Sequence, residues 1–432
     1  MRNKILTLAL LFSLPFLLTA CSLKDLPVIG GLFGGSGGSG KAQTLTMWGL
    51  WEKPDVMGVL IKKYQENQPN ITINYEDRSV VNTNDYKERI FTHAREKAEG
   101  ADIVMVHSSW VPRLYPALTP MSSKLMVSQK YAELFYPSAV ENAIFQGKIY
   151  AVPAYYDGLV LLYNKKHFEE ISQRVPPTAW EEFRRLALQL SVYTGDASNR
   201  VLIRAGAAIG NSSNIEHFSD ILGLLFAQAG VKVPADLDTK AAQDALVFYT
   251  NFIKEDGVWS DSFPEATTAF AQGKVSMIFV PAWRVVDILA TAPDLSFGVA
   301  MVPQVSQDAP VSWSTYWMYA VPSASGNSAA AWDFLNFLMQ EDQQLSQFSE
   351  ASKTRPFGAA YSLKSLAPQL SSNEYLAPLL NTAPFGKSYE IAGRAGNKKQ
   401  TDALKEVIDA VLSGSQSSPK DLLTKAKTAF PL

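Results

Sequence analysis

The stretch ADIVMVHSSW, residues 101–110, decides the fold class of this chain. Residues 102–106 are an almost continuous apolar run, which is typical of a strand buried on both faces of a parallel sheet. Polar and aromatic residues follow at once. The strand is therefore predicted to end where the chain places its unusual side chains.

The segments before this strand predict an open α/β sheet. Residues 44–48 are a short β-prone run, residues 56–64 carry apolar side chains at helical spacing, and residues 71–75 alternate as in a strand. A second helix with one apolar face follows over residues 86–98. Such β-α-β-α-β sheets bind ligands at the carboxyl ends of their strands.

Aromatic residues gather at predicted strand ends and in loops. Ser108 also follows a strand. Of the nine tryptophans, those expected in such places are Trp48, Trp51, Trp110, Trp283, Trp313 and Trp317. A flat aromatic face packs well on the C–H face of a sugar ring, while carboxylates, amides and arginines bond its hydroxyls. The pattern indicates a carbohydrate cleft, with packing between lobes as the alternative for any single tryptophan.

Length and composition indicate a two-lobed globular domain. The chain from about Gln43 onward is too long for one simple core. Its 47% hydrophobic and 19% charged residues supply an ordinary core and surface. The net charge of −2 comes without a basic stripe, which argues against nucleic acid as a partner.

The N-terminus has the layout of a secretory signal. Two cations precede the apolar run 5–18, which is shorter than the ~20 residues of a membrane span. Residues 18–21, Leu-Thr-Ala-Cys, resemble the lipobox of bacterial lipoproteins. The resemblance implies that residues 1–20 are removed and that Cys21 becomes a lipidated first residue on the extracytoplasmic face of a cell membrane. An ordinary signal with a chance cysteine is the alternative.

Residues 21–42 are predicted to tether the domain to that anchor. They contain Gly-Gly-Ser-Gly-Gly-Ser-Gly at 34–40, a flexible composition. The same glycines match short hydrolase and phosphate-binding patterns, but those patterns need a strand-turn-helix context that is not expected here. Cys21 is the only cysteine, so an intramolecular disulfide is excluded.

Five fragments, in the same order along the chain, resemble the extracellular solute-binding proteins of bacterial carbohydrate ABC importers, the group containing maltodextrin-binding protein. The most specific is GKIYAVP at 147–153, continuing to LYNK at 162–165, which is similar to the family's G-K-x-Y-x-V-P…L-Y-Y-N-K segment. The others are residues 101–106 with Trp110, 177–183, 269–277 with 282–283, and 330–338.

This resemblance implies an α/β, two-lobe, periplasmic-binding-protein-like (Venus flytrap) fold that closes on one ligand without altering it. The three hinge crossings it implies lie near residues 152–159, 299–303 and 320–323. The discontinuous lobes it implies are residues 43–153 plus 304–321, and residues 154–303 plus 322–432. Partners would be a sugar or oligosaccharide and the subunits of an ABC permease, with the protein itself a monomer. Closure around a ligand is a state that a permease can distinguish.

The resemblance also implies roles for single residues. Asp157 follows Tyr155 and Tyr156 at the first crossing, where the family often supplies a carboxyl or amide to sugar hydroxyls. The alternative is a hinge carboxylate satisfied by backbone N–H groups. Trp283 matches the family's stacking tryptophan on the second lobe. Arg355 has a planar fork suited to two hydroxyls, or to a surface ion pair.

If residues 313–317 form a strand, their aromatic side chains cannot all face the same side. Trp313 and Trp317 would face one side of a strand and Tyr316 the other, so all three line one cleft only if the strand begins later.

Other functions remain open from the sequence. The four histidines are scattered without an H-E-x-x-H pattern, so no metal site, cofactor or enzymatic activity is expected. The carboxylate pair of a lipid-anchored glycosidase depends on the fold and is not testable from sequence. The nearer alternative is the same fold binding a peptide, a polyamine or a glycerol phosphate. Polyamines call for several cleft carboxylates and phosphates for cations, which favours neutral sugars.

Overall fold

The computed structural model describes residues 41–96, 100–196, 199–393 and 396–430. The predicted signal peptide, Cys21 and nearly all of the tether lie outside these residues. Residues 42–432 form one compact unit. No helix among the described residues is both long and apolar enough to cross a membrane.

The first of two large sheets confirms the predicted β-α-β-α-β order. Its strands, in spatial order, are β2 (Ile71–Asp77), β1 (Gln43–Gly49), β3 (Ile103–His107), β13 (Trp317–Ala320) and β6 (Ala151–Pro153). Strand β1 runs parallel to β2 and β3, whereas β13 is antiparallel to β3 and β6. The crossover helices are α1 (Pro54–Asn67) and α2 (Thr83–Glu96).

Burial explains why these segments adopt these structures. All five residues of β3 are buried, as its continuous apolar run predicts. Helix α1 begins with a proline in its first turn and buries one face, formed by Val56, Met57, Leu60, Ile61 and Tyr64.

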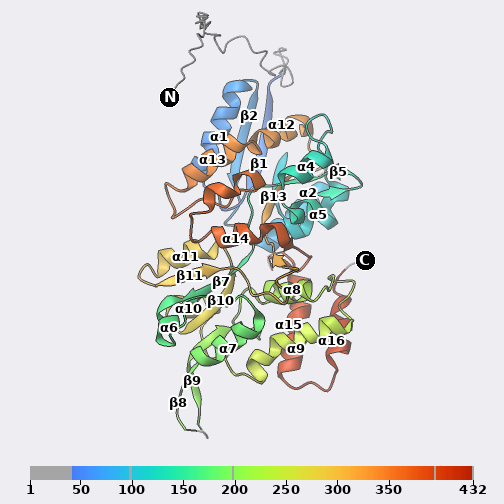
Figure 1. Cartoon of the computed structure of the whole chain (residues 1–432). Coiled ribbons are helices and arrows are strands. Elements are labelled where there is room, and N and C mark those ends of the chain that lie inside the picture. The colour runs from blue at the N-terminus through green and yellow to red at the C-terminus, as the bar shows by residue number, and fades with distance from the viewer. Residues whose placement is uncertain (1–40, 97–99, 197–198, 394–395, 431–432) are drawn as a thin grey trace, which may run out of the picture. The chain divides into compact units, whose positions relative to one another are not determined.

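The second sheet forms a separate lobe. Its strands, in spatial order, are β11 (Phe297–Ala300), β7 (Leu159–Asn164), β10 (Val275–Pro281), β9 (Val201–Ala208) and β8 (Val192–Thr194). Strand β10 is buried along its whole length, parallel to β9 and antiparallel to β7. Figure 1 shows the two sheets in the upper and lower halves of the unit, so the two-lobe α/β fold is confirmed.

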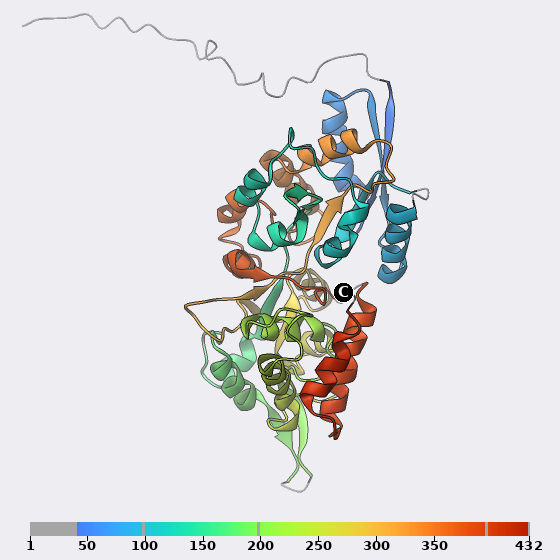
Figure 2. The same ribbon diagram turned by 90° about the vertical axis from the view of Figure 1, so that its right-hand side faces the viewer.

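Helices cover both sheets. Those of the second lobe are α6 (Lys165–Glu170), α7 (Trp180–Leu190), α8 (Phe218–Gln228), α9 (Lys240–Lys254), α10 (Ala266–Ala271), α11 (Arg284–Thr291), α14 (Ala377–Thr382), α15 (Lys398–Leu412) and α16 (Pro419–Lys427). Figure 2 shows α15 and α16, in red, side by side along the second lobe, where they pack on α9.

Shorter elements complete the unit. The helices are α3 (Val111–Leu114), α4 (Ser128–Leu134), α5 (Pro137–Ala143), α12 (Ser328–Leu338) and α13 (Glu341–Ala351). The 3-10 helices are η2 (Ser108–Trp110), η3 (Tyr115–Ala117), η4 (Lys364–Leu370) and η5 (Ala383–Phe385). Two small ribbons pair β4 (Ile144–Phe145) with β5 (Lys148–Ile149), and β12 (Ser312–Trp313) with β14 (Gly386–Lys387).

Three passages of the chain meet where the lobes join. The first joins β6 to β7 and falls within the predicted range 152–159. Tyr156 makes an antiparallel bridge to Ala360, and Gly158 makes one to Ser314. The second and third passages therefore lie near residues 314–316 and 360. The predicted positions, 299–303 and 320–323, are wrong.

Specific contacts explain this correction of the lobe boundaries. After β11 the chain stays with the second lobe, where the Gln228 amide donates to the carbonyls of Pro303 and Val311. After β13 it stays with the first lobe, because α12 and α13 pack on α1 and the Tyr64 hydroxyl donates to Asp333 at 2.8 Å. Residues 322–351 thus belong to the first lobe rather than, as predicted, to the second.

The meeting point leaves no room for a side chain at Gly158. A Cβ atom there would lie 2.4 Å from the backbone oxygen of Trp313. We expect Gly158→Ala to lower the free energy of unfolding by about 1–3 kcal/mol, because overpacking forces the backbone passages apart. Urea denaturation measures the change.

The matched control is Gly58→Ala on the exposed face of α1, where nothing lies within 4 Å of the added carbon. This change should raise the free energy of unfolding by about 0.5–1 kcal/mol, since alanine favours a helix interior over glycine. Equal stability of the two variants would contradict the close packing at Gly158.

Candidate functional site

A cavity of ≈440 Å³ lies between the two lobes, against the point where the passages meet. The first lobe contributes Leu50, Trp51, Glu52, Thr83, Met105, His107, Trp317 and Tyr319. The hinge region contributes Tyr155, Tyr156, Asp157, Thr315, Arg355, Phe357 and Ala360 among others. The second lobe contributes Glu216, His217, Pro281, Ala282, Trp283, Val286, Asp287, Leu376, Leu379 and Gly393.

Many of these side chains lie at the end of a strand or just after it. Trp51 follows the carboxyl end of β1, and His107 is the last residue of β3. On the second lobe, Trp283 follows the end of β10, and His217 closes the loop that follows β9. The cavity therefore lies where an open α/β sheet is expected to hold a ligand.

An aromatic cluster forms the wall on the first lobe. Trp51, Trp110 and His107 pack edge-on around Trp317, at ring-centroid distances of 4.7, 5.1 and 5.2 Å. Trp51 adopts a left-handed backbone conformation, with φ of 59°, and stays 47% exposed. The packed rings fix Trp317, and Trp51 presents aromatic surface to the cavity.

Trp283 forms the matching aromatic surface on the second lobe. It is 45% exposed at the start of α11, and the Arg284 guanidinium lies 4.2 Å from its ring centroid. This arginine covers one face of the indole by a cation–π contact. The cavity thus has one half-exposed tryptophan from each lobe.

The buried carboxylate of Asp157 ties the hinge to the turn that carries Trp283. Its Oδ1 accepts from the backbone N–H groups of Gly158 and Ala282, at 2.7 and 2.9 Å. Its Oδ2 accepts a longer bond from the N–H of Trp283, at 3.4 Å. Burial raises the pKa of Asp157 to about 7, against the opposing effect of these donors. Asp157 matches the alternative of a hinge carboxylate satisfied by backbone groups, although it also lines the cavity.

Arginines at the cavity are paired with carboxylates. The Arg355 fork lies 3.4 Å from Glu52 and donates to the carbonyl of Phe357 at 3.1 Å. Arg284 forms ion pairs with Glu216 and with Asp287. The arginine charges are therefore balanced within the protein, and the lining as a whole is not cationic.

His107 supplies a neutral polar group. Its Nδ1 lies 2.7 Å from the Ser109 hydroxyl and its Nε2 lies 3.1 Å from the Thr315 hydroxyl. Burial lowers the pKa of His107 to about 4, so the ring is uncharged at neutral pH. Within the described part of the chain, no group of three His, Cys, Asp or Glu side chains is placed to hold a metal ion.

Residues 52–345 match the family described as bacterial extracellular solute-binding protein. The chain belongs to this family. A mannitol-binding protein of Pseudomonas aeruginosa is 24% identical over 284 residues, which are 63% of each chain.

Solved structures of other solute-binding proteins share the fold. A cyclic α-maltosyl-1,6-maltose binding protein from Arthrobacter globiformis is 22% identical, with a TM-score of 0.70 over 90% of this chain and 98% of that chain. An ABC transporter solute-binding protein from Thermotoga lettingae, solved with α-D-tagatose bound, is 21% identical, with a TM-score of 0.66 over 89% and 98% of the two chains.

The structure of this solute-binding protein brings together only some of the residues predicted for the site. Those that line the cavity are Trp51, Tyr155, Tyr156, Asp157, Trp283, Trp317 and Arg355. Those that do not are Trp48, Ser108, Trp110, Trp313 and Tyr316.

The predicted residues that lie outside the cavity pack within the protein instead. Trp48 lies against Arg78 and His93, and Trp110 lies beneath Trp317 in the aromatic cluster. Ser108 is fully buried in η2.

Residues 313–317 do not form one strand, so the parity argument does not apply to them. Residues 314–316 separate β12 from β13. The Trp313 indole is turned into the second lobe, where its Nε1 donates to Asp220 at 2.7 Å. Tyr316 is fully buried, with its hydroxyl 3.4 Å from that of Ser138.

Sequence reasoning missed several polar residues of the cavity. The most prominent are Glu52, Glu216, His217 and Thr315, and the backbone of Gly393 also lines the cavity. The strand-end rule would have found Glu216 and His217, since both close the loop after β9. No sequence pattern marks Thr315 or Gly393.

The raised pKa of Asp157 predicts how stability depends on pH. Between its ordinary value of 3.8 and about 7, the folded protein keeps a proton that the unfolded chain has lost. Stability from this group is therefore lost as the pH rises through that range. From pH 5 to pH 8, we expect the free energy of unfolding of the wild type to fall by about 1–3 kcal/mol relative to Asp157→Asn.

Urea denaturation of both proteins at a series of pH values measures this difference. Because an asparagine side chain does not titrate, the Asp157→Asn variant corrects for every other group. A difference that stays constant or grows with pH would contradict the raised pKa.

Proposed function

We propose that this chain is the substrate-binding protein of an ABC-type sugar importer. It captures a sugar or short oligosaccharide between its lobes and delivers it to a permease. The observation that carries the proposal is the pair of half-exposed indoles, Trp51 and Trp283, contributed by opposite lobes to one cavity of ≈440 Å³.

The lining suits the chemistry of a neutral sugar. Indole faces pack on the C–H face of a sugar ring, and the nearby carboxylates are hydrogen-bonding partners for hydroxyls. The cavity lies in the lower half of the ~300–1,000 Å³ range of small-molecule sites, which favours one or two sugar rings over a long oligosaccharide. A mannitol-binding relative and a tagatose-bound structure of the same fold agree with a ligand of this size.

Contacts with both lobes allow the ligand to stabilise one arrangement of the lobes over another. A sugar that touches Trp51 on one lobe and Trp283 on the other binds the closed arrangement better than an open one. The closed form is then the state that a permease recognises. No chemical change of the sugar is required, and recovery of unaltered sugar from the complex separates this function from that of a glycosidase.

A polyamine is the second candidate ligand, favoured by the lining carboxylates Glu52, Asp157, Glu216 and Asp287. The contacts that these carboxylates already make favour a sugar over a polyamine, because the carboxylates are engaged within the protein. Arg355 pairs with Glu52, and backbone donors satisfy Asp157. Arg284 pairs with Glu216 and Asp287. A glycerol phosphate is disfavoured, because both arginines are engaged by carboxylates. Peptides remain as comparison ligands.

Titration of intrinsic tryptophan fluorescence tests the proposed function. Mono- and oligosaccharides are compared with spermidine, glycerol 3-phosphate and short peptides. We expect a saturable change with one class of sugar. We expect Trp283→Ala to weaken binding of that sugar at least tenfold, about 1.4 kcal/mol, because the stacking surface of the second lobe is lost.

Phe385→Ala is the matched control. Phe385 is also a large exposed aromatic residue, at 43%, but it lies outside the cavity, and its loss should leave affinity unchanged. A response to spermidine or a peptide, with none to any sugar, would retain the fold and reject the sugar assignment.

Membrane attachment through Cys21 is part of the proposed function and rests on the lipobox-like residues 18–21. We expect Cys21→Ser to abolish incorporation of radiolabelled palmitate and to move the protein from the membrane fraction to the soluble extracytoplasmic fraction. Ser22→Ala, one residue further on, should change neither property. Retention of Cys21→Ser in the membrane fraction would refute the anchor.

A further inference from the structure

A buried polar pair lies beside the aromatic surface of the second lobe. His217 lines the cavity and is only 6% exposed, and Asp220 is fully buried one helical turn later in α8. Neither ring nitrogen of His217 has a hydrogen-bond partner among the described residues, and neither does Oδ2 of Asp220. A buried polar atom without a partner loses its hydrogen bonds to water and gains none in return, so this pair calls for a partner.

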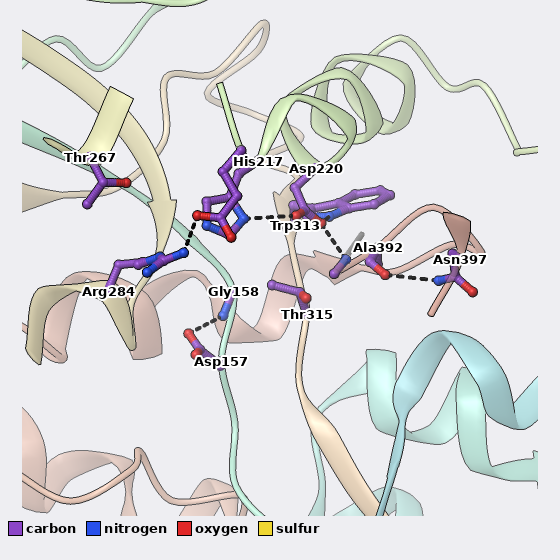
Figure 3. A network of polar contacts seen from close by, with 12 residues as sticks. Asp157, Gly158, His217, Asp220, Thr267, Arg284, Trp313, Thr315, Ala392 and Asn397 are labelled. Atoms are coloured by element: carbon purple, nitrogen blue, oxygen red, sulfur yellow. Dashed lines mark hydrogen bonds and ion pairs between the residues drawn. The ribbon is translucent and has the colours of Figure 1, made fainter. Parts of the chain in front are cut away.

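Asp220 is held in place by two other segments. Its Oδ1 accepts from the Trp313 indole N–H and from the backbone N–H of Gly393, both at 2.7 Å. Figure 3 shows Asp220 and the Trp313 indole side by side at the start of α8. Gly393 adopts φ of +69°, and a Cβ atom there would lie 2.4 Å from Nε2 of His107. The backbone can approach Asp220 this closely because the residue is glycine.

The remaining oxygen of Asp220 orients the imidazole. Oδ2 lies 3.5 Å from Nδ1 of His217. A neutral histidine carries one ring proton, and a neighbouring carboxylate favours the tautomer that carries it on the near nitrogen. With a single ring proton, the imidazole therefore carries it on Nδ1 and presents Nε2 as an acceptor.

The imidazole of His217 lies beside the stacking surface. The rings of His217 and Trp283 are perpendicular, with centroids 6.3 Å apart, and both side chains line the cavity. A ring held on Trp283 would bring a hydroxyl at its edge toward the imidazole. Such a hydroxyl can donate a hydrogen bond to Nε2. No group among the described residues donates one to this atom.

We propose that Nε2 of His217 accepts a hydrogen bond from a hydroxyl of the bound sugar, and that Asp220 is a positioning residue that holds His217 in the required tautomer. The inference rests on the proposed function and deepens it. It specifies a ligand with a free hydroxyl at the edge of the ring that stacks on Trp283. A sugar that lacks this hydroxyl leaves the acceptor buried without a partner and is rejected.

Calorimetric titration with D-mannitol, D-tagatose, maltose and maltotriose tests the role of His217. For the sugar that the wild type binds most tightly, we expect His217→Ala to weaken binding at least tenfold. His217→Gln, which retains an acceptor oxygen, should recover part of that loss. His167→Ala is the control, because His167 is a buried histidine outside the cavity that contacts Ser276.

Imidazole ¹⁵N resonances test the role of Asp220 without relying on affinity. In the free wild type, we expect the proton of His217 on Nδ1, and in Asp220→Asn a shift of the tautomer toward Nε2–H. Addition of the tightest-binding sugar should move the Nε2 resonance of the wild type. A purely structural role of either residue would leave the tautomer and this response unchanged.

The outcomes separate the two proposals. If the wild type binds one of the sugars and His217→Ala binds it within twofold, or if the free protein carries the proton on Nε2, the inference is wrong and the proposed function stands. If the wild type binds no mono- or oligosaccharide in the fluorescence titration, the proposed function fails and the ligand contact fails with it. Unfolding midpoints of the variants verify that each is folded.

Discussion

The buried carboxylate of Asp157 is the constraint on which the cavity depends. Backbone N–H groups of Gly158, Ala282 and Trp283 converge on its two oxygens, and its own carbonyl accepts from the N–H of Thr315 at 3.0 Å. One residue thus joins the first passage between the lobes, the second passage and the turn after β10. The position of Trp283 follows from these bonds rather than from packing of its half-exposed ring. The same bonds oppose the cost of burying a charge, and burial prevails in raising the pKa.

The balance of charge around that point determines what the cavity can recognise. Arg355 and Arg284 are each engaged by carboxylates, so neither is available as a free anion-binding fork. His107 is uncharged because it is buried. What remains available to a ligand is aromatic surface and neutral hydrogen-bonding groups, and this combination distinguishes ligands by the positions of their hydroxyls rather than by their charge. Specificity then depends on the placement of polar atoms, of which the acceptor of His217 is the one we single out.

Periodicity was sufficient to predict the elements that are local in sequence. The burial of β3 and the apolar face of α1 follow from patterns of a few residues. Errors arose where distant segments decide the structure. The break between β12 and β13 turned Trp313 toward Asp220, and packing of α12 and α13 on α1 moved residues 322–351 to the first lobe. His217 satisfies the strand-end rule by its place after β9, but no sequence pattern marks it.

The place of β13 in the first sheet has a consequence for any folding that begins before the whole chain has emerged. This strand lies between β3 and β6, yet it is made after every strand of the second sheet. The nascent first lobe therefore has β3 and β6 without their shared neighbour until residue 320 has emerged, while β7 to β11 already have all their partners. Unpaired strand edges are templates for wrong pairing, so the interval before β13 arrives is when the nascent protein most needs protection from aggregation. The sheet that begins first is completed last.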